Sequence, residues 1–193
     1  IMNSGTPIVM FDRVADGINC DKVVVDDFDS AYDATSHLIK LGSKKIALLS
    51  TIQNLSVGKL RLDGYKKALS DANMSIDENL IIQETSIEDF DVQLQQLISS
   101  KKMDAIFALD EHSSTMTMRM ALKQGIKIPE ELNIIGFADG VWSRRLTPSL
   151  STVSQHAPEI GAKAAELLIH KLNSKDEFYQ PQTVVIKTEL RQR

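Results

Sequence analysis

The chain has 193 residues, of which 42% are hydrophobic and 25% charged, so it is long enough to bury a core and has an ordinary globular composition. Its formal net charge of -4 gives no general attraction to nucleic acid or anionic lipid, which excludes DNA binding driven by the overall charge of this chain. No stretch reaches the length of a membrane span, the first residues lack the basic segment of a signal peptide, and Cys20 alone cannot form an intramolecular disulfide. A reducing, cytoplasmic setting is compatible with this composition.

Short β-branched runs alternate with segments of helical periodicity, a pattern that predicts βαβ units and a parallel sheet. The sequence predicts strands at 7–11, 22–25, 44–50, 80–83, 103–109, 133–137 and 183–188. It predicts helices at 28–39, 58–72, 90–98 and 112–124, and a last one that starts near Pro158. Two strands at the start with no helix between them, and one helix near the end, do not fit the regular repeat in the middle. We interpret them as parts of a second lobe.

Acidic residues follow most of the predicted strands, where ligands of open α/β sheets collect. They include Asp12, Asp26, Asp27, Asp110 and Asp139. Arg61 lies at the start of the helix after one of these strand ends. Carboxylates accept hydrogen bonds from vicinal hydroxyls and a guanidinium donates two in parallel, so this set suits a polyhydroxylated ligand. Three alternatives stay open: a magnesium site, aspartates that only cap helices, and a surface salt bridge for Arg61.

Signals for catalysis are weak, because the nucleotide-binding, zinc-protease and hydrolase motifs are all absent from the sequence. Asp110, His112 and Ser113 have the residue types of a triad, but such close neighbours at a helix start rarely face one another. The four histidines lack the spacing of metal ligands, so we expect no metal and no cofactor. Met116, Met118 and Met120 are predicted to fill the core or, alternatively, to form a partner surface.

Six motifs in order carry a family resemblance. They are "GTPIVMFDR", "VVVDDFDSAYDATSHLIKLGSKKIALLS", "RLDGYKKAL", "DAIFALDE", "GIKIPEELNIIGFADG" and "TPSLSTVSQHAPEIGAKAAELLI". The chain resembles, over about residues 5–191, the effector-binding core of lactose/galactose-repressor (LacI/GalR) family transcription regulators. The resemblance implies an α/β, two-lobed, periplasmic-binding-protein-like fold of type I, with parallel sheets flanked by helices and an incomplete N-terminal lobe.

The resemblance also implies a domain organisation. Residues 1–26 and 155–178 are expected to form the partial N-terminal lobe, and residues 27–154 and 179–193 the C-terminal lobe. The DNA-binding helix-turn-helix headpiece of the family is not part of this chain.

In the family a small-molecule effector sits in the inter-lobe cleft and favours one arrangement of the lobes. Carried over by position, the residues expected to line or border this cleft are Asp12, Val25, Asn54, Val57, Arg61, Asp110, Asp139, Trp142 and Gln155. Arg61, three residues before Gly64 and Tyr65, matches the ligand-clamping arginine of the family. We predict that Arg61→Ala abolishes effector binding and leaves the melting temperature within a few degrees, whereas a collapsed fold would support a salt bridge.

Two positions depart from the family pattern. Leu109 stands where the family usually has asparagine, and Ala138 where it commonly has an acid. Each change removes a polar group, and an unmade hydrogen bond in a buried site costs about 1–3 kcal/mol. We therefore expect an effector that is not gripped like a simple pyranose: a less polar ligand, a different pose, or a protein co-regulator.

The resemblance implies the effector-binding and dimerisation domain of a cytoplasmic transcription regulator, most simply a repressor that senses a sugar or sugar derivative. The implied partners are the effector, a second copy of the chain, and operator DNA reached through the headpiece; no membrane is expected. The alternatives are a periplasmic sugar-binding receptor of a transport system and, from a different class, a magnesium-dependent α/β enzyme.

Overall fold

The computed structural model describes residues 6–138, 140, 142–174 and 179–193, and gives no side-chain placement for Trp142. The chain divides into two compact units, each built from separate segments. Unit 1 comprises Ile1–Asp26 and Gln155–Thr188, and unit 2 comprises Asp27–Ser154 and Glu189–Arg193.

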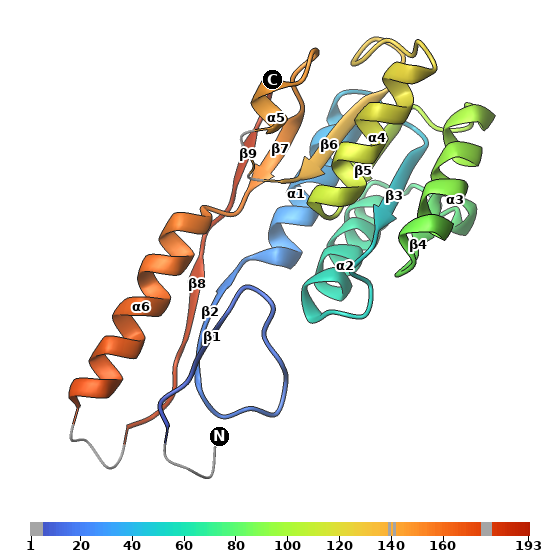
Figure 1. Cartoon of the computed structure of the whole chain (residues 1–193). Helices are drawn as coiled ribbons and strands as arrows, with labels where there is room; N and C mark the ends of the chain where they lie inside the picture. Colours follow the sequence, from blue (N-terminus) through green and yellow to red (C-terminus); the bar gives the residue numbers. More distant parts are fainter. Residues whose placement is uncertain (1–5, 139, 141, 175–178) are drawn as a thin grey trace. The chain divides into compact units, whose positions relative to one another are not determined.

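Unit 1 contains a parallel three-stranded sheet in the order β1-β2-β8, with one helix packed along it (Figure 1). Its elements are β1 (Val9–Phe11), β2 (Asp21–Val25), α6 (Ala157–Asn173) and β8 (Thr183–Ile186). Alternate residues of β2 are buried, as expected for a strand with one covered face. Val23, Val25 and Ile186 pack there against Ile160 and other apolar residues of α6.

Unit 2 contains a six-stranded sheet in the order β4-β3-β5-β6-β7-β9, parallel except for β9. Its strands are β3 (Ile46–Ser50), β4 (Ile81–Gln83), β5 (Ala105–Ala108), β6 (Asn133–Phe137), β7 (Ser151–Ser154) and β9 (Glu189–Arg191). Its helices are α1 (Asp27–Lys40), α2 (Ser56–Asp71), η2 (Glu78–Leu80), α3 (Ile87–Ser100), α4 (Glu111–Lys123) and α5 (Trp142–Arg145). These elements confirm the predicted α/β class with helix-flanked parallel sheets.

Both faces of the six-stranded sheet are covered: α1 and α2 lie on one face, α3 and α4 on the other (Figure 1). The strands are therefore apolar on both sides, and all five residues of β3 are buried. Gly64 lets α1 and α2 approach closely, because a Cβ at this position would lie 2.3 Å from the Phe28 carbonyl oxygen. Tyr65 follows it, fully buried, and its hydroxyl donates to the carbonyl oxygen of Ile46 at 2.7 Å.

The expected position of the last strand was wrong. Residues 183–188 had been assigned to the C-terminal lobe together with 179–193, but β8 pairs in parallel with β2 and belongs to unit 1. The β2 edge gives β8 hydrogen-bonding partners, and Ile186 gains a place in the core under α6. Only the short β9, antiparallel to β7, belongs to unit 2.

Candidate functional site

Arg61 lies on α2 with its guanidinium at the carboxyl-terminal edge of the unit 2 sheet. Its side chain is only 4% exposed, and that of Asp27, its ion-pair partner at the start of α1, is 2% exposed. Arg61 Nε donates to Asp27 Oδ1 at 2.7 Å, and a terminal nitrogen donates to the Leu109 carbonyl oxygen at 2.6 Å. The alternative of a surface salt bridge is therefore wrong, because this ion pair is buried.

Phe137 is a further neighbour of Arg61. The guanidinium carbon lies 3.5 Å from the centre of the Phe137 ring, a cation–π arrangement at the last residue of β6. One side chain thus joins the start of α1, the end of β5 and the end of β6. Arg61 can be identified from the sequence, but Asp27 and Phe137 cannot be identified as its neighbours, because both contacts are long-range.

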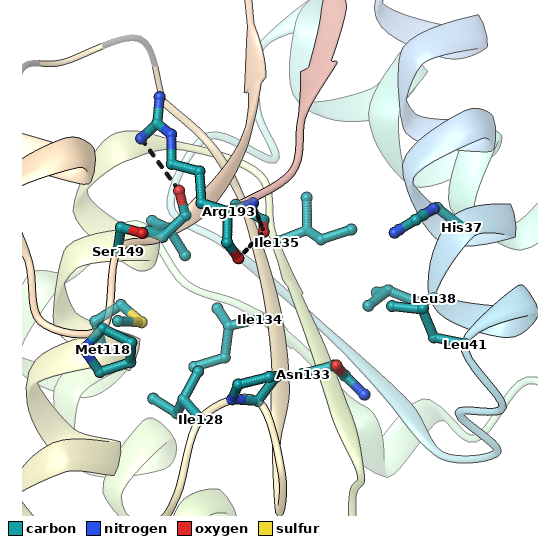
Figure 2. Close-up of a pocket in the computed structure, with 14 residues that line it drawn as sticks. His37, Leu38, Leu41, Met118, Ile128, Asn133, Ile134, Ile135, Ser149 and Arg193 are labelled. Atoms are coloured by element: carbon teal, nitrogen blue, oxygen red, sulfur yellow. Dashed lines mark hydrogen bonds between the residues drawn. The ribbon is translucent and has the colours of Figure 1, made fainter.

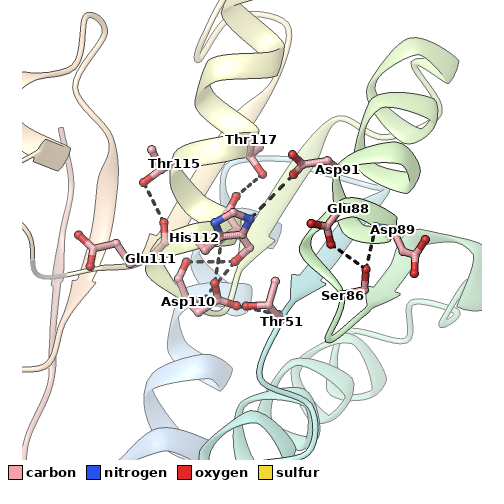
Figure 3. A network of polar contacts seen from close by, with 11 residues as sticks. Thr51, Ser86, Glu88, Asp89, Asp91, Asp110, Glu111, His112, Thr115 and Thr117 are labelled. Atoms are coloured by element: carbon pink, nitrogen blue, oxygen red, sulfur yellow. Dashed lines mark hydrogen bonds and ion pairs between the residues drawn. The ribbon is translucent and has the colours of Figure 1, made fainter.

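Asp110 is held by backbone N–H groups on both carboxylate oxygens. Oδ1 accepts from Ser113 N in a capping box that begins α4, and Oδ2 accepts from Thr51 N in the loop after β3, each at 2.8 Å (Figure 3). The capping alternative is therefore confirmed for Asp110. The same bonds fix the loop after β3 relative to α4.

His112, in the first turn of α4, faces α3 and does not form a triad with Asp110 and Ser113. His112 Nε2 lies 3.8 Å from Asp91 Oδ1 (Figure 3). The imidazole also packs edge-on to the Phe90 ring. The Ser113 hydroxyl instead donates to the Asp110 carbonyl oxygen. These contacts connect two helices and hold no activated nucleophile.

The remaining expected residues of unit 2 have different surroundings. Val57 is buried at the start of α2, whereas Asn54 is exposed in the loop before it. Leu109 is fully buried and contributes its carbonyl oxygen to Arg61, and Ala138 is 6% exposed. Asp139 lies outside the described residues. Trp142 begins α5, and its side chain also lies outside the description.

Unit 1 contains three of the expected residues. Asp12 has a left-handed backbone, with φ of 56°, and its half-exposed carboxylate lies 3.8 Å from Arg13 Nε. Val25 packs in the core under α6 and is 5% exposed. Gln155 is partly buried where the chain re-enters unit 1.

Asp26 and Asp27 are adjacent in sequence but serve different units. Asp26 accepts from Thr188 N at 2.9 Å and pairs with Lys187 Nζ at 3.1 Å, all within unit 1. Burial alone would raise the pKa of the Asp26 carboxyl, but the hydrogen bonds from Thr188 and Lys187 hold this pKa below its ordinary value.

A pocket of about 230 Å³ lies at the opposite edge of the unit 2 sheet, where β6 and β7 begin (Figure 2). Its floor is apolar, with Leu38, Ile134 and Ile135, and its rim includes His37 and Arg193. It contains none of the expected effector residues. Over the part of the chain that the structure describes, no group of three or more His, Cys, Asp or Glu is placed to hold a metal ion, and no helix is long and apolar enough to cross a membrane.

Comparison with known proteins places the chain in a family. Residues 35–193 match the model of the periplasmic binding protein-like domain. The ribose operon repressor of Haemophilus influenzae (strain ATCC 51907 / DSM 11121 / KW20 / Rd) is 32% identical over 178 residues, which are 90% of this chain and 53% of that protein. The chain thus spans about half the length of this curated relative.

Two solved structures share the fold and exceed 25% identity. The transcription regulator CcpA of Lactococcus lactis is 27% identical with a TM-score of 0.87, over 100% of this chain and 70% of that one. The complex of the transcriptional regulator CelR with cellobiose is 26% identical with a TM-score of 0.87, over 98% of this chain and 59% of that one. The chain therefore belongs to the periplasmic binding protein-like family and corresponds to the effector-binding core of lactose/galactose-repressor family regulators.

Proposed function

We propose that this chain is the effector-sensing part of a DNA-binding transcription regulator, most simply a repressor, and that its effector is a sugar or sugar derivative. The observation that carries the proposal is the similarity to the ribose operon repressor over 90% of the chain. The regulator described as a complex with cellobiose, which has the same fold, supports a carbohydrate ligand. DNA contact would be made by a headpiece outside this chain, in the cytoplasm.

Within unit 2, the proposed effector contact is Arg61. Its guanidinium is held at the carboxyl-terminal edge of the sheet, where α/β proteins bind ligands, and buried donors discriminate strongly between hydroxylated and apolar molecules. Asp110 supports the site indirectly, by fixing the loop after β3. Asp12, Asn54, Val57, Asp139, Trp142 and Gln155 remain proposed contacts from the family pattern. The role assigned to all of them is binding, without catalysis.

A panel of sugars, nucleosides and sugar phosphates, screened by thermal shift and followed by calorimetry, tests this proposal. We expect at least one sugar to raise the melting temperature, because a ligand that binds only the folded state stabilises it. If heat is released when magnesium and a phosphoester are added to the protein, but not when sugars are added, the result would instead support a magnesium-dependent enzyme. A gel-shift assay on the full-length protein separates a regulator, whose operator binding responds to the sugar, from a transport receptor, which binds sugar but no operator.

We further propose that the protein is a homodimer that uses the α3–α4 surface of unit 2. Met118 is fully buried, but Met116 and Met120 are only partly buried and line a groove of about 290 Å³ with Arg119 and Lys123. Flexible methionines with an arginine are common in protein interfaces. Light scattering of the full-length protein should give a dimer mass, and Met120→Glu should lower it toward the monomer.

A further inference from the structure

The charge of Arg61 is already compensated within the protein. Asp27 forms a hydrogen-bonded ion pair with Nε at 2.7 Å, and both side chains are almost completely buried. Because Coulomb interactions are strong where water is excluded, the close carboxylate cancels most of the positive potential of the guanidinium. Arg61 therefore offers hydrogen-bond donors but little net attraction for an anion.

The balance of buried charge around this site is negative. Among the described residues of unit 2, the buried charged side chains are Asp27, Asp110 and Arg61, two carboxylates and one guanidinium. The positive ends of two helices could in principle attract an anion at this edge. Asp110, however, already caps α4 with its carboxylate, and Asp27 places a second carboxylate in the first turn of α1.

We propose that Asp27 is a specificity-determining residue, which restricts the effector site to neutral polyhydroxylated molecules and excludes phosphorylated sugars. This inference rests on the proposed effector site at Arg61. A phosphate group brought to the guanidinium would also meet the Asp27 carboxylate, and like charges at close range in a dry site suppress the wrong ligand. A hydroxyl has no such penalty, since it accepts from the guanidinium without adding charge.

Calorimetry on the unmodified protein tests this selectivity directly. The probes are ribose, glucose and cellobiose, each compared with its monophosphate. We expect any neutral sugar that binds to bind at least about tenfold more tightly than its phosphate, because the phosphate adds charge repulsion. A phosphate that binds more tightly than its neutral parent would overturn the role of Asp27 and leave the sensing function standing. If neither these sugars nor any sugar or sugar derivative of the thermal-shift panel binds, the proposed function is wrong.

Inorganic phosphate provides a second test that does not depend on the sugar. Asp27→Asn removes the carboxylate but keeps a similar shape, and Asp63→Asn removes the same charge from an exposed position on α2 as a control. Melting temperatures are compared in phosphate and in sodium chloride of equal ionic strength. At about ten times its dissociation constant, phosphate should raise the melting temperature of Asp27→Asn by about 3–6 °C more than that of the unmodified protein or the control.

The comparison of phosphate with chloride also tests the proposal if Asp27→Asn folds poorly. If Asp27→Asn is unfolded in chloride, phosphate should restore its folded structure, seen by circular dichroism, because the anion replaces the missing carboxylate. An equal response to phosphate in all three proteins, or a variant that phosphate does not recover, would show that Asp27 does not control the charge of this site.

Discussion

Replacing Arg61 with alanine should destabilise unit 2 strongly, in contrast to the small change in melting temperature predicted from the sequence. The change removes the hydrogen bonds to Asp27 and the Leu109 carbonyl and uncovers the Phe137 ring. It also leaves the Asp27 carboxylate, 2% exposed, without its arginine. Breaking a buried ion pair by removing one partner costs about 3–5 kcal/mol. In a protein of this length each kcal/mol of lost stability lowers the melting temperature by about 2–4 °C. This loss therefore corresponds to a melting temperature lower by about 6–20 °C.

The assay is thermal and urea unfolding, followed by circular dichroism, with Lys59→Ala as the matched control. Lys59 is an exposed cation on the same helix, so its removal should change stability by less than about 0.5 kcal/mol. A melting temperature for Arg61→Ala within about 2 °C of the unmodified protein would refute the reasoning. That result would mean that the ion pair contributes nothing to the folded state and that Arg61 serves binding alone.

The double variant Asp27→Leu with Arg61→Met separates the two parts of this cost. An apolar pair of similar volume avoids the desolvation of two charges, and such replacements are often neutral or stabilising. We therefore expect the double variant to be more stable than Arg61→Ala by at least about 2 kcal/mol. If it is equally unstable, the unpaired carboxylate is a minor part of the cost, and the guanidinium's own contacts with the Leu109 carbonyl and the Phe137 ring, lost in both variants, are the main part.

Three further predictions follow from single positions. Gly64→Ala should lower the free energy of unfolding in urea by about 1–3 kcal/mol, because the new Cβ would lie 2.3 Å from a carbonyl oxygen of α1. The control, Gly161→Ala, adds a Cβ with nothing within 4 Å and should instead stabilise the protein by about 0.5–1 kcal/mol. Equal effects of the two changes would contradict the close approach of α1 and α2. Tyr65→Phe leaves the buried Ile46 carbonyl without its donor and should cost about 1–3 kcal/mol; an unchanged urea midpoint would contradict this. The pKa of Asp26 is lower in the folded than in the unfolded protein. The Asp26 carboxylate therefore stabilises the fold at pH values above its unfolded-state pKa, and this stabilisation is lost as the pH falls through its folded-state pKa. Asp26→Asn should thus flatten the acid limb of stability below about pH 4, and an unaltered acid limb would count against the Thr188 and Lys187 contacts.

Local pattern was sufficient for most of the elements and some of their ends, but it did not predict the short η2, α5 and β9. Gly42 and Asn73 lie just beyond the predicted helices 28–39 and 58–72, and their positive φ values, 95° and 55°, are typical of residues that end a helix. Periodicity also predicted the helix 58–72, which the structure has as α2 (Ser56–Asp71). These features depend on neighbours within one or two turns, which is the range that a sequence pattern reports.

The ion pair of Arg61 and the pairing of β8 depend on contacts that no local pattern contains. Arg61 and Asp27 are 34 positions apart, and the sequence predicts Asp27 as a strand-end acid or a helix cap but not as the ion-pair partner of Arg61. The segment 183–188 was correctly predicted as extended, but its partner strand is 161 positions away, with Lys22 opposite Thr183. A short strand with one buried residue fits either sheet by sequence alone, so its place is decided by which edge is open.

The contacts of Arg61 also indicate how an effector could act on unit 2. One guanidinium joins the start of α1, the end of β5 and the end of β6 through Asp27, Leu109 and Phe137. An effector that accepts hydrogen bonds from the Arg61 guanidinium must compete with these contacts. Such an effector can change the protein only if its affinity differs between two arrangements of the contacts. Arg61→Lys keeps the charge but not the planar group that makes all three contacts at once. In this variant, sugar affinity should fall and the response of operator binding to saturating sugar should also shrink; a response of full size at saturation would show that the three-way contact does not carry the signal.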